Sequence, residues 1–226
     1  MDSNKLGLNE FITKEQECQM YLHQAQILTR HYEFDLVLSL THKVLSISLN
    51  YDFVNFTVEA LELKISCYSE LGNLREFNAT VAQLRNWNEK QALERNSLII
   101  YQTVKVYLKQ TVRKRQHYLQ SLPNMIQQLK DTWEKCLTFT SFDAYYKVSI
   151  YYYELVGEFD AIISMTKQSQ LWFEDNKANV YRFDQLYNKF ILVYAHFRSK
   201  LLAEGLMYAS KYVSDFSKSS YNWFSY

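Results

Sequence analysis

Apolar residues recur along this chain at helical spacing, in segments separated by short polar turns. Residues 14–31 place apolar side chains at i, i+4 and i+7, which is one face of a helix. Strand-like alternation is scarce, so no large β-sheet is expected. The pattern therefore predicts an all-α protein of about ten helices. The predicted helices cover residues 14–31, 34–50, 53–71, 74–87, 91–110, 124–137, 141–156, 158–175, 176–199 and 202–216.

Four short turn sequences join one amphipathic helix to the next. They are HYEFDLV (31–37), ELGNLREF (70–77), LVGEFDAI (155–162) and RSKLLAEGL (198–206). The aligned positions Phe34, Leu74, Phe159 and Leu202 lie 40, 85 and 43 residues apart. We interpret the 85-residue interval as two units of about 42 residues, and a fixed period of helix pairs in this range is typical of an α-solenoid.

Helix-breaking residues are rare and lie where the pattern predicts turns. Only four Gly and one Pro are present, and three of the Gly fall in the recurring turns. Pro123 predicts a kink or a new helix start near 121–124. Asp52 and Ser141 are predicted to cap the helices that follow them.

Composition allows a sizeable hydrophobic core and indicates a reducing compartment. Hydrophobic residues make up 48% of the chain. Its 19 Tyr are suited to the contacts between helices of a thin array, where the ring is buried and the hydroxyl reaches water. Cys18, Cys67 and Cys136 are isolated and odd in number, which indicates buried thiols rather than a disulfide framework. We see no signal peptide in MDSNKLGLNEF and no apolar run of membrane-spanning length. A cytoplasmic location is therefore expected.

The sequence carries no recognisable catalytic or cofactor motif. Its five His form no H-E-x-x-H and lie near no Cys at zinc-site spacing. No nucleophile elbow or phosphate-binding loop is present, and neighbouring carboxylates point to different helix faces. We expect no enzyme activity, no cofactor and no metal. The basic stretch 105–117 is interpreted as a solvated surface, with nucleic-acid binding as a weaker alternative.

Residues 67–84 and 151–165 resemble the middle section of a tetratricopeptide repeat. The resemblance extends over most of 14–216, although the repeats are degenerate and longer than is usual for that family. It implies one tetratricopeptide-like domain over 14–226, built as a right-handed α-solenoid of antiparallel helix pairs. Residues 1–13, which precede the first predicted helix, are expected to form a frayed lead-in. The matching positions are Tyr68, Gly72 and Leu74 in the first segment and Tyr153, Gly157 and Phe159 in the second.

The same resemblance implies a concave groove lined by the first helix of each pair. We expect this groove to bind a protein or an extended peptide, as a non-enzymatic scaffold. The alternative hypothesis is the ligand-sensing part of a bacterial transcription regulator that lacks its DNA-binding domain. The groove positions transferred from the family are Gln26, Arg30, Glu62, Ser66, Lys147, Tyr151, Phe190, Tyr194 and Phe197.

The chain ends in an apolar, aromatic cluster. The segment from YNKFILVYAH through SSYNWFSY also resembles long helical-repeat proteins of bacteria, in which the array continues further. An uncovered cluster of this kind indicates an interface or a missing neighbour. We therefore expect either that the array continues beyond residue 226 or that two protomers pair through this end. The residues concerned are Tyr221, Trp223, Phe224 and Tyr226.

Overall fold

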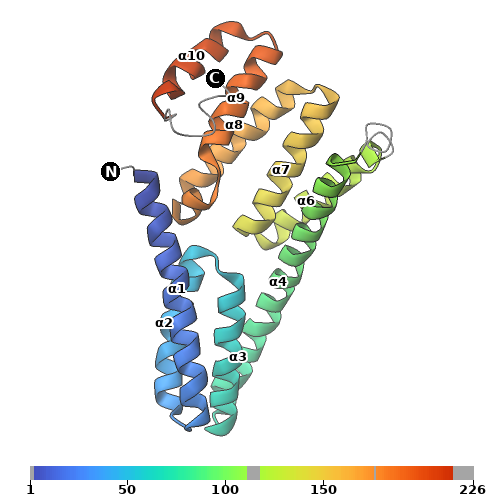
Figure 1. The fold of residues 1–226 in the computed structure, drawn as a ribbon. Helices are drawn as coiled ribbons and strands as arrows, with labels where there is room; N and C mark the ends of the chain where they lie inside the picture. The colour runs from blue at the N-terminus through green and yellow to red at the C-terminus, as the bar shows by residue number, and fades with distance from the viewer. Residues whose placement is uncertain (1–2, 111–117, 176, 216–226) are drawn as a thin grey trace. The chain divides into compact units, whose positions relative to one another are not determined.

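The computed structural model describes residues 3–110, 118–175 and 177–215. Within these ranges it contains nine α-helices, two short 3-10 helices and no strand, so the all-α prediction is confirmed (Figure 1). By their contacts the residues form two compact units, Met1–Asn96 and Ser97–Tyr226. We call them unit 1 and unit 2 and describe each by itself. One continuous array over 14–226 stays a prediction.

Unit 1 is formed by three helices and the first part of a fourth. The helix α1 packs against α2 and α3, and α2 packs against α3 (Figure 1). The helix bounds are α1 (Ser3–Arg30), α2 (Phe34–Tyr51), α3 (Val54–Glu70) and α4 (Leu74–Leu108), of which α4 runs on into unit 2.

Small side chains allow α1 and α3 to approach closely. Cys18 and Ala25 on α1 are fully buried, as are Ala60 and Cys67 on α3. Each pair is seven residues apart, so each lies on one face of its helix. Leucines, aromatic residues and Val44 of α2 fill the space around them. These helices thus bury one face each, whereas Leu36 of α2 is 53% exposed.

Unit 2 continues the pattern of successive antiparallel elements. Neighbouring helices pack in chain order, α6 on α7, α7 on α8, α8 on α9 and α9 on α10. Its elements after the end of α4 are α6 (Leu122–Cys136), α7 (Phe139–Val156), α8 (Phe159–Asp175), the 3-10 helix η1 (Lys177–Arg182), α9 (Gln185–Arg198), α10 (Leu202–Tyr212) and the 3-10 helix η2 (Val213–Asp215).

Aromatic packing dominates the core of unit 2. Phe142 of α7 is almost fully buried, and its ring stacks on Trp172 of α8 with centroids 4.5 Å apart. Tyr146, one helical turn further on, meets the ring of Phe183 edge-on at 5.1 Å. Such pairs contribute about 1 kcal/mol each beyond the area they bury. The Tyr-rich α7 is therefore a core helix of this unit.

One turn geometry connects the helices at six places. In each, a residue in the left-handed conformation is followed by one residue, after which the next helix begins. In five of them the N–H after the left-handed residue donates to the carbonyl five residues earlier, which closes the helix end. The four recurring turn sequences are all among them. The left-handed residues are Tyr32, Asp52, Gly72, Leu137, Gly157 and Lys200.

The predicted break between residues 87 and 91 is wrong, because α4 is continuous from Leu74 to Leu108. No Gly or Pro occurs between Asn73 and Pro123, so the chain has no strong signal to end a helix there. Side-chain contacts also support the continuous helix at this point. Gln91 Nε2 donates to Asn55 Oδ1 of α3 at 2.9 Å, and Lys90 Nζ lies 4.7 Å from the Trp87 ring.

Three further helix starts differ from or refine the expectation. The helix α1 begins at Ser3, so the expected lead-in is helical from that residue. Pro123 lies in the first turn of α6, where its missing N–H costs no hydrogen bond, and the predicted new start is confirmed. Ser141 does not cap α7, because it is buried inside the helix and donates to the Thr138 carbonyl at 2.8 Å.

The predicted helix over 176–199 is shorter than expected. The 3-10 helix η1 comes first, and α9 begins only at Gln185. Asp184 caps α9, because its Oδ1 accepts from the Tyr187 N–H at 2.9 Å. The link expected at 111–117 lies outside the described residues.

Candidate binding surfaces

The groove residues predicted in unit 1 are solvent-exposed and lie on two helices in contact. Gln26 and Arg30 belong to α1, and Glu62 and Ser66 belong to α3. Each pair is spaced i, i+4 and so shares one helix face. These four side chains therefore offer polar groups that a partner can reach.

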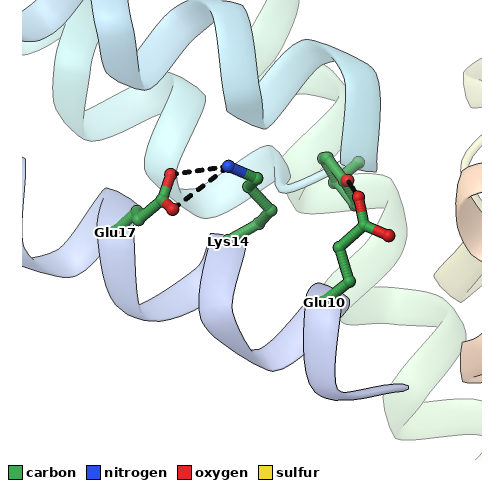
Figure 2. Close-up of polar contacts among 4 residues, drawn as sticks. Glu10, Lys14 and Glu17 are labelled. Atoms are coloured by element: carbon green, nitrogen blue, oxygen red, sulfur yellow. Dashed lines mark hydrogen bonds and ion pairs between the residues drawn. The ribbon is translucent and has the colours of Figure 1, made fainter. Parts of the chain in front are cut away.

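A second polar row lies on the first half of α1. Figure 2 shows Glu10, Lys14 and Glu17 along this helix, with both Glu17 oxygens within 3.1 Å of Lys14 Nζ. Tyr51, at the end of α2, donates to Glu10 Oε1 at 2.8 Å. Burial, and secondly this hydrogen bond, raise the pKa of Tyr51 to about 12. The row ties the start of α1 to the end of α2, which accounts for order in a segment expected to fray.

The near-neutral net charge hides an opposite imbalance in the two units. Residues 1–96 contain nine Lys and Arg against 13 Asp and Glu, whereas residues 97–226 contain 16 against 11. Unit 1 is thus formally negative and unit 2 formally positive.

The predicted residues Lys147 and Tyr151 lie in a half-buried group of tyrosines and lysines in unit 2. The group joins three helices, because α4 and α9 contribute side chains beside those of α7. We call it the tyrosine–lysine cluster. It consists of Tyr101 and Lys105 of α4, Asp143, Lys147 and Tyr151 of α7, and Tyr187 of α9.

An ion pair anchors the centre of this cluster. Lys147 Nζ lies 2.6 Å from Asp143 Oδ2, and the Asp143 side chain is only 19% exposed. Burial raises the pKa of Asp143, while Lys147 and Arg182 act in the opposite direction. The other carboxylate oxygen, Oδ1, is buried and accepts no hydrogen bond from the described residues. The cluster therefore holds a carboxylate that is only partly compensated.

Two lysines flank the ring of Tyr101. Lys105 Nζ lies 5.3 Å from the ring centroid and Lys147 Nζ lies 5.7 Å from it, both within cation–π range. Burial, with the neighbouring Tyr101 hydroxyl, raises the pKa of Tyr151 to about 12. Burial also raises the pKa of Tyr187. Both hydroxyls therefore stay protonated at neutral pH.

The three groove residues predicted on α9 take part in packing to different degrees. Phe190 stacks on Tyr194 with centroids 6.2 Å apart, and Tyr194 meets the Phe159 ring of α8 edge-on at 5.8 Å. Arg198 lies 4.4 Å over the Phe159 ring and donates to the Tyr194 hydroxyl at 2.6 Å. Phe197 is 42% exposed. Tyr194 is thus held by its neighbours, whereas Phe197 presents its ring to solvent.

The predicted C-terminal interface residues Tyr221, Trp223, Phe224 and Tyr226 lie outside the described residues. The helix α10 precedes them and carries its own exposed apolar side chains on one face. Within the described residues nothing covers this face. Contiguous apolar surface of this kind is typical of an interaction site. The exposed side chains are Leu202, Leu206, Met207 and, in η2, Val213.

Four members of the tyrosine–lysine cluster escaped the sequence reasoning, and one of them, Lys105, was interpreted only as part of a solvated basic stretch. Asp143 could have been found, because it precedes Lys147 by four residues and such pairs form ion pairs on a helix. Tyr101 and Tyr187 could not, since only the packing of α4 and α9 beside α7 brings them there.

Comparison with protein-family models, with curated proteins and with solved structures gave no match to this chain. In the part that the structure describes, no helix has the length and apolar character needed to cross a membrane. The same residues include no group of three or more His, Cys, Asp or Glu that could hold a metal ion. Because none of the three comparisons gave a match, the resemblance to tetratricopeptide repeats rests on the turn and packing pattern of the sequence alone.

Proposed function

We propose that the chain is a non-enzymatic scaffold that binds an extended peptide or a protein segment. In this proposal its antiparallel helix pairs stack as a right-handed, tetratricopeptide-like solenoid, with the first helix of each pair lining a concave groove. The repeated left-handed turn supports the stacking, because it reverses the chain direction in the same way each time. Three free, buried thiols support a reducing, cytoplasmic setting.

The observation that carries this proposal is the tyrosine–lysine cluster. Half-buried tyrosines combine ring area with a hydroxyl donor and lose little side-chain entropy on binding, so they serve well as anchors. Lys147 is held by Asp143, whereas Lys105 forms no ion pair with a carboxylate among the described residues. The cluster thus offers hydroxyl donors and one lysine whose charge is not compensated.

Charge indicates which peptide fits. Lys109, one turn beyond Lys105, is exposed and also forms no ion pair in the part of the chain described. Unit 2 as a whole has more basic than acidic residues. We infer that the partner segment carries carboxylates that meet Lys105, together with backbone carbonyls or apolar groups that meet the tyrosines.

Fluorescence anisotropy with labelled peptides tests this proposal on the full chain. We expect a peptide of alternating Glu and Tyr to bind, and a peptide of alternating Lys and Tyr not to bind. Binding should weaken as salt is added, because exposed charges contribute. Equal binding of the two peptides would show that charge does not select the partner, which would contradict the proposed acidic segment.

A matched pair of variants locates the site. Lys105→Glu reverses the charge beside Tyr101 and should lower the affinity for the acidic peptide by roughly tenfold or more. Lys135→Glu makes the same change at an exposed position of α6 and should alter affinity little. Tyr151→Phe removes one hydroxyl and should weaken binding without unfolding the protein. If Lys105→Glu binds as the wild type does, the cluster is not the site.

Self-association is a second candidate function, favoured by the exposed apolar face of α10. We infer that two protomers pair through this helix and the aromatic residues that follow it. Light scattering after size exclusion should give a dimer that Leu206→Glu converts to a monomer. A monomeric wild type at all concentrations would exclude this pairing. The transcription-regulator hypothesis stays an untested alternative.

A further inference from the structure

The last part of α4 has one buried face and one exposed face in unit 2. Ile100 and Val104 belong to the core of this unit, whereas Ile99 is 64% exposed and Val106 is 56% exposed. Ile99 and Val106 are seven residues apart, so they lie on one side of the helix, two turns from each other. We call this side the exposed α4 face. It consists of Ile99, Gln102, Val106 and Lys109, with Leu98 and Lys105 along its edge.

The exposed α4 face lies in a stretch of the sequence without any acidic residue. Residues 95–130 contain seven Lys and Arg and no Asp or Glu. Neither Lys105 nor Lys109 forms an ion pair with a carboxylate of the described residues. The face thus combines solvent-exposed aliphatic side chains with lysines whose charge is not compensated. This combination favours a partner that is both anionic and apolar.

The residue types on this face favour a lipid surface over a protein or a nucleic acid. Protein interfaces are depleted in Lys, and their affinity depends mostly on Trp, Tyr and Arg rather than on Leu or Val. Proteins bind single-stranded nucleic acids with aromatic side chains that stack on the bases, and the exposed α4 face has no aromatic residue. Aliphatic side chains beside lysines are typical of helices that lie in the headgroup region of a membrane. The lysine stems then cover apolar surface while the ammonium groups reach the lipid phosphates.

We propose that the exposed α4 face binds reversibly to a membrane surface that contains anionic phospholipids. Ile99 and Val106 insert between the headgroups, and Lys105 and Lys109 are attracted by the negative charge of the lipids. Two or three aliphatic side chains bind a membrane only weakly by themselves, so the apolar and the electrostatic contributions are both needed. This function goes beyond peptide binding at the tyrosine–lysine cluster, with which the face shares Lys105.

Sedimentation of the full chain with large unilamellar vesicles tests this proposal. We expect binding to vesicles of equal parts phosphatidylcholine and phosphatidylserine, and little binding to vesicles of phosphatidylcholine alone. Binding to the mixed vesicles should weaken as salt is added, because exposed lysines contribute to it. No binding to the mixed vesicles, or equal binding to both kinds of vesicle, would overturn the proposal.

A neutral double variant isolates the apolar contribution. Ile99→Ser with Val106→Ser removes the two exposed aliphatic side chains at unchanged charge, and should lower the affinity for mixed vesicles by roughly tenfold or more. Val156→Ser with Leu171→Ser makes a matched change at exposed positions of α7 and α8, and should leave the affinity unchanged. Circular dichroism verifies that both double variants are folded. An unchanged vesicle affinity of the Ile99→Ser, Val106→Ser variant would contradict the insertion of this face.

The same variant separates this proposal from peptide binding. Its affinity for the peptide of alternating Glu and Tyr should equal that of the wild type, because the tyrosine–lysine cluster is intact. A loss of peptide binding without a loss of vesicle binding would mean that the exposed α4 face binds a protein segment, and the membrane proposal would then be wrong. Lys109→Gln removes one cation from the face and should lower the affinity for mixed vesicles by roughly fivefold. Equal vesicle affinities of Lys109→Gln and the wild type would contradict the electrostatic contribution.

Discussion

Gly205 of α10 faces His196 of α9 so closely that a Cβ added at Gly205 would lie 3.2 Å from His196 Cβ. His196 is buried, its Nδ1 lies 2.7 Å from the Leu192 carbonyl oxygen, and its ring packs 4.9 Å from that of Tyr208. The Cβ of His196 cannot move without moving α9. This contact therefore fixes how closely the last two α-helices of the described chain pack.

A larger side chain at Gly205 should destabilise unit 2. We expect Gly205→Val to lower the free energy of unfolding by about 2 kcal/mol, because overpacking forces α9 and α10 apart. Ala203→Val makes a similar change at an exposed position of the same helix and should cost about 0.5 kcal/mol, the difference in helix propensity. Urea unfolding followed by circular dichroism measures both. Equal effects of the two variants would show that the close approach is not restrictive.

A Lys→Gly substitution should change the free energy of unfolding in opposite directions in a left-handed turn and inside a helix. Lys200 has a φ of 61°, which costs a residue with a Cβ about 1–2 kcal/mol. Lys200→Gly should therefore raise the free energy of unfolding by roughly 0.5–1 kcal/mol, after the entropy of the unfolded chain is counted. Lys167→Gly, at an exposed position inside α8, should lower it by about 1 kcal/mol. Thermal unfolding of the two variants gives the comparison, and changes of the same sign would contradict it.

Asp143 should make the stability of unit 2 depend on pH. Burial raises its pKa in the folded state, so the native protein binds this proton more tightly than the unfolded chain does. The wild type then loses stability as pH rises from the unfolded value of about 3.9 through the higher native pKa. Asp143→Asn stays neutral, so its stability relative to wild type should be near zero at about pH 3 and positive at pH 7. Midpoints of thermal unfolding across this range test the sign, and a variant that is less stable at pH 7 would refute it.

The buried thiols should report separately on the two units. Burial raises the pKa of Cys18 to about 11, so little reactive thiolate forms near neutral pH. Leu22→Ala removes core volume in unit 1 and should speed alkylation of Cys18 and Cys67, at a cost of about 3 kcal/mol. Leu129→Ala does the same in unit 2 and should expose Cys136 instead. Mass spectrometry of the alkylated peptides distinguishes the thiols. Simultaneous labelling of all three in both variants would mean that the units unfold together.

The sequence predicted helix ends well where glycine occupies the left-handed position. Gly72 and Gly157 mark their turns directly, and both turns are found where the pattern placed them. Leu137 gave no such signal, because a non-glycine residue adopts the left-handed conformation there only under tertiary constraint. The missing break in α4 has a related cause, since apolar spacing alone does not separate two short helices from one long helix.

Site residues were predictable only where they share a helix. Lys147 and Tyr151 were placed through a repeat pattern, and Asp143 lies within reach of the same reasoning. Tyr101 depends on the unexpected length of α4, because the break expected near residue 90 would have placed its helix differently.

The even spacing of the left-handed residues has an evolutionary consequence. Tyr32, Asp52 and Gly72 follow one another at intervals of 20 residues, and so do Leu137 and Gly157. An insertion of twice that length adds one antiparallel helix pair, after which the chain continues in its original direction. Genes for such chains can therefore lengthen by tandem duplication of whole helix pairs. The helices that follow such a duplication keep the same packing against their neighbours.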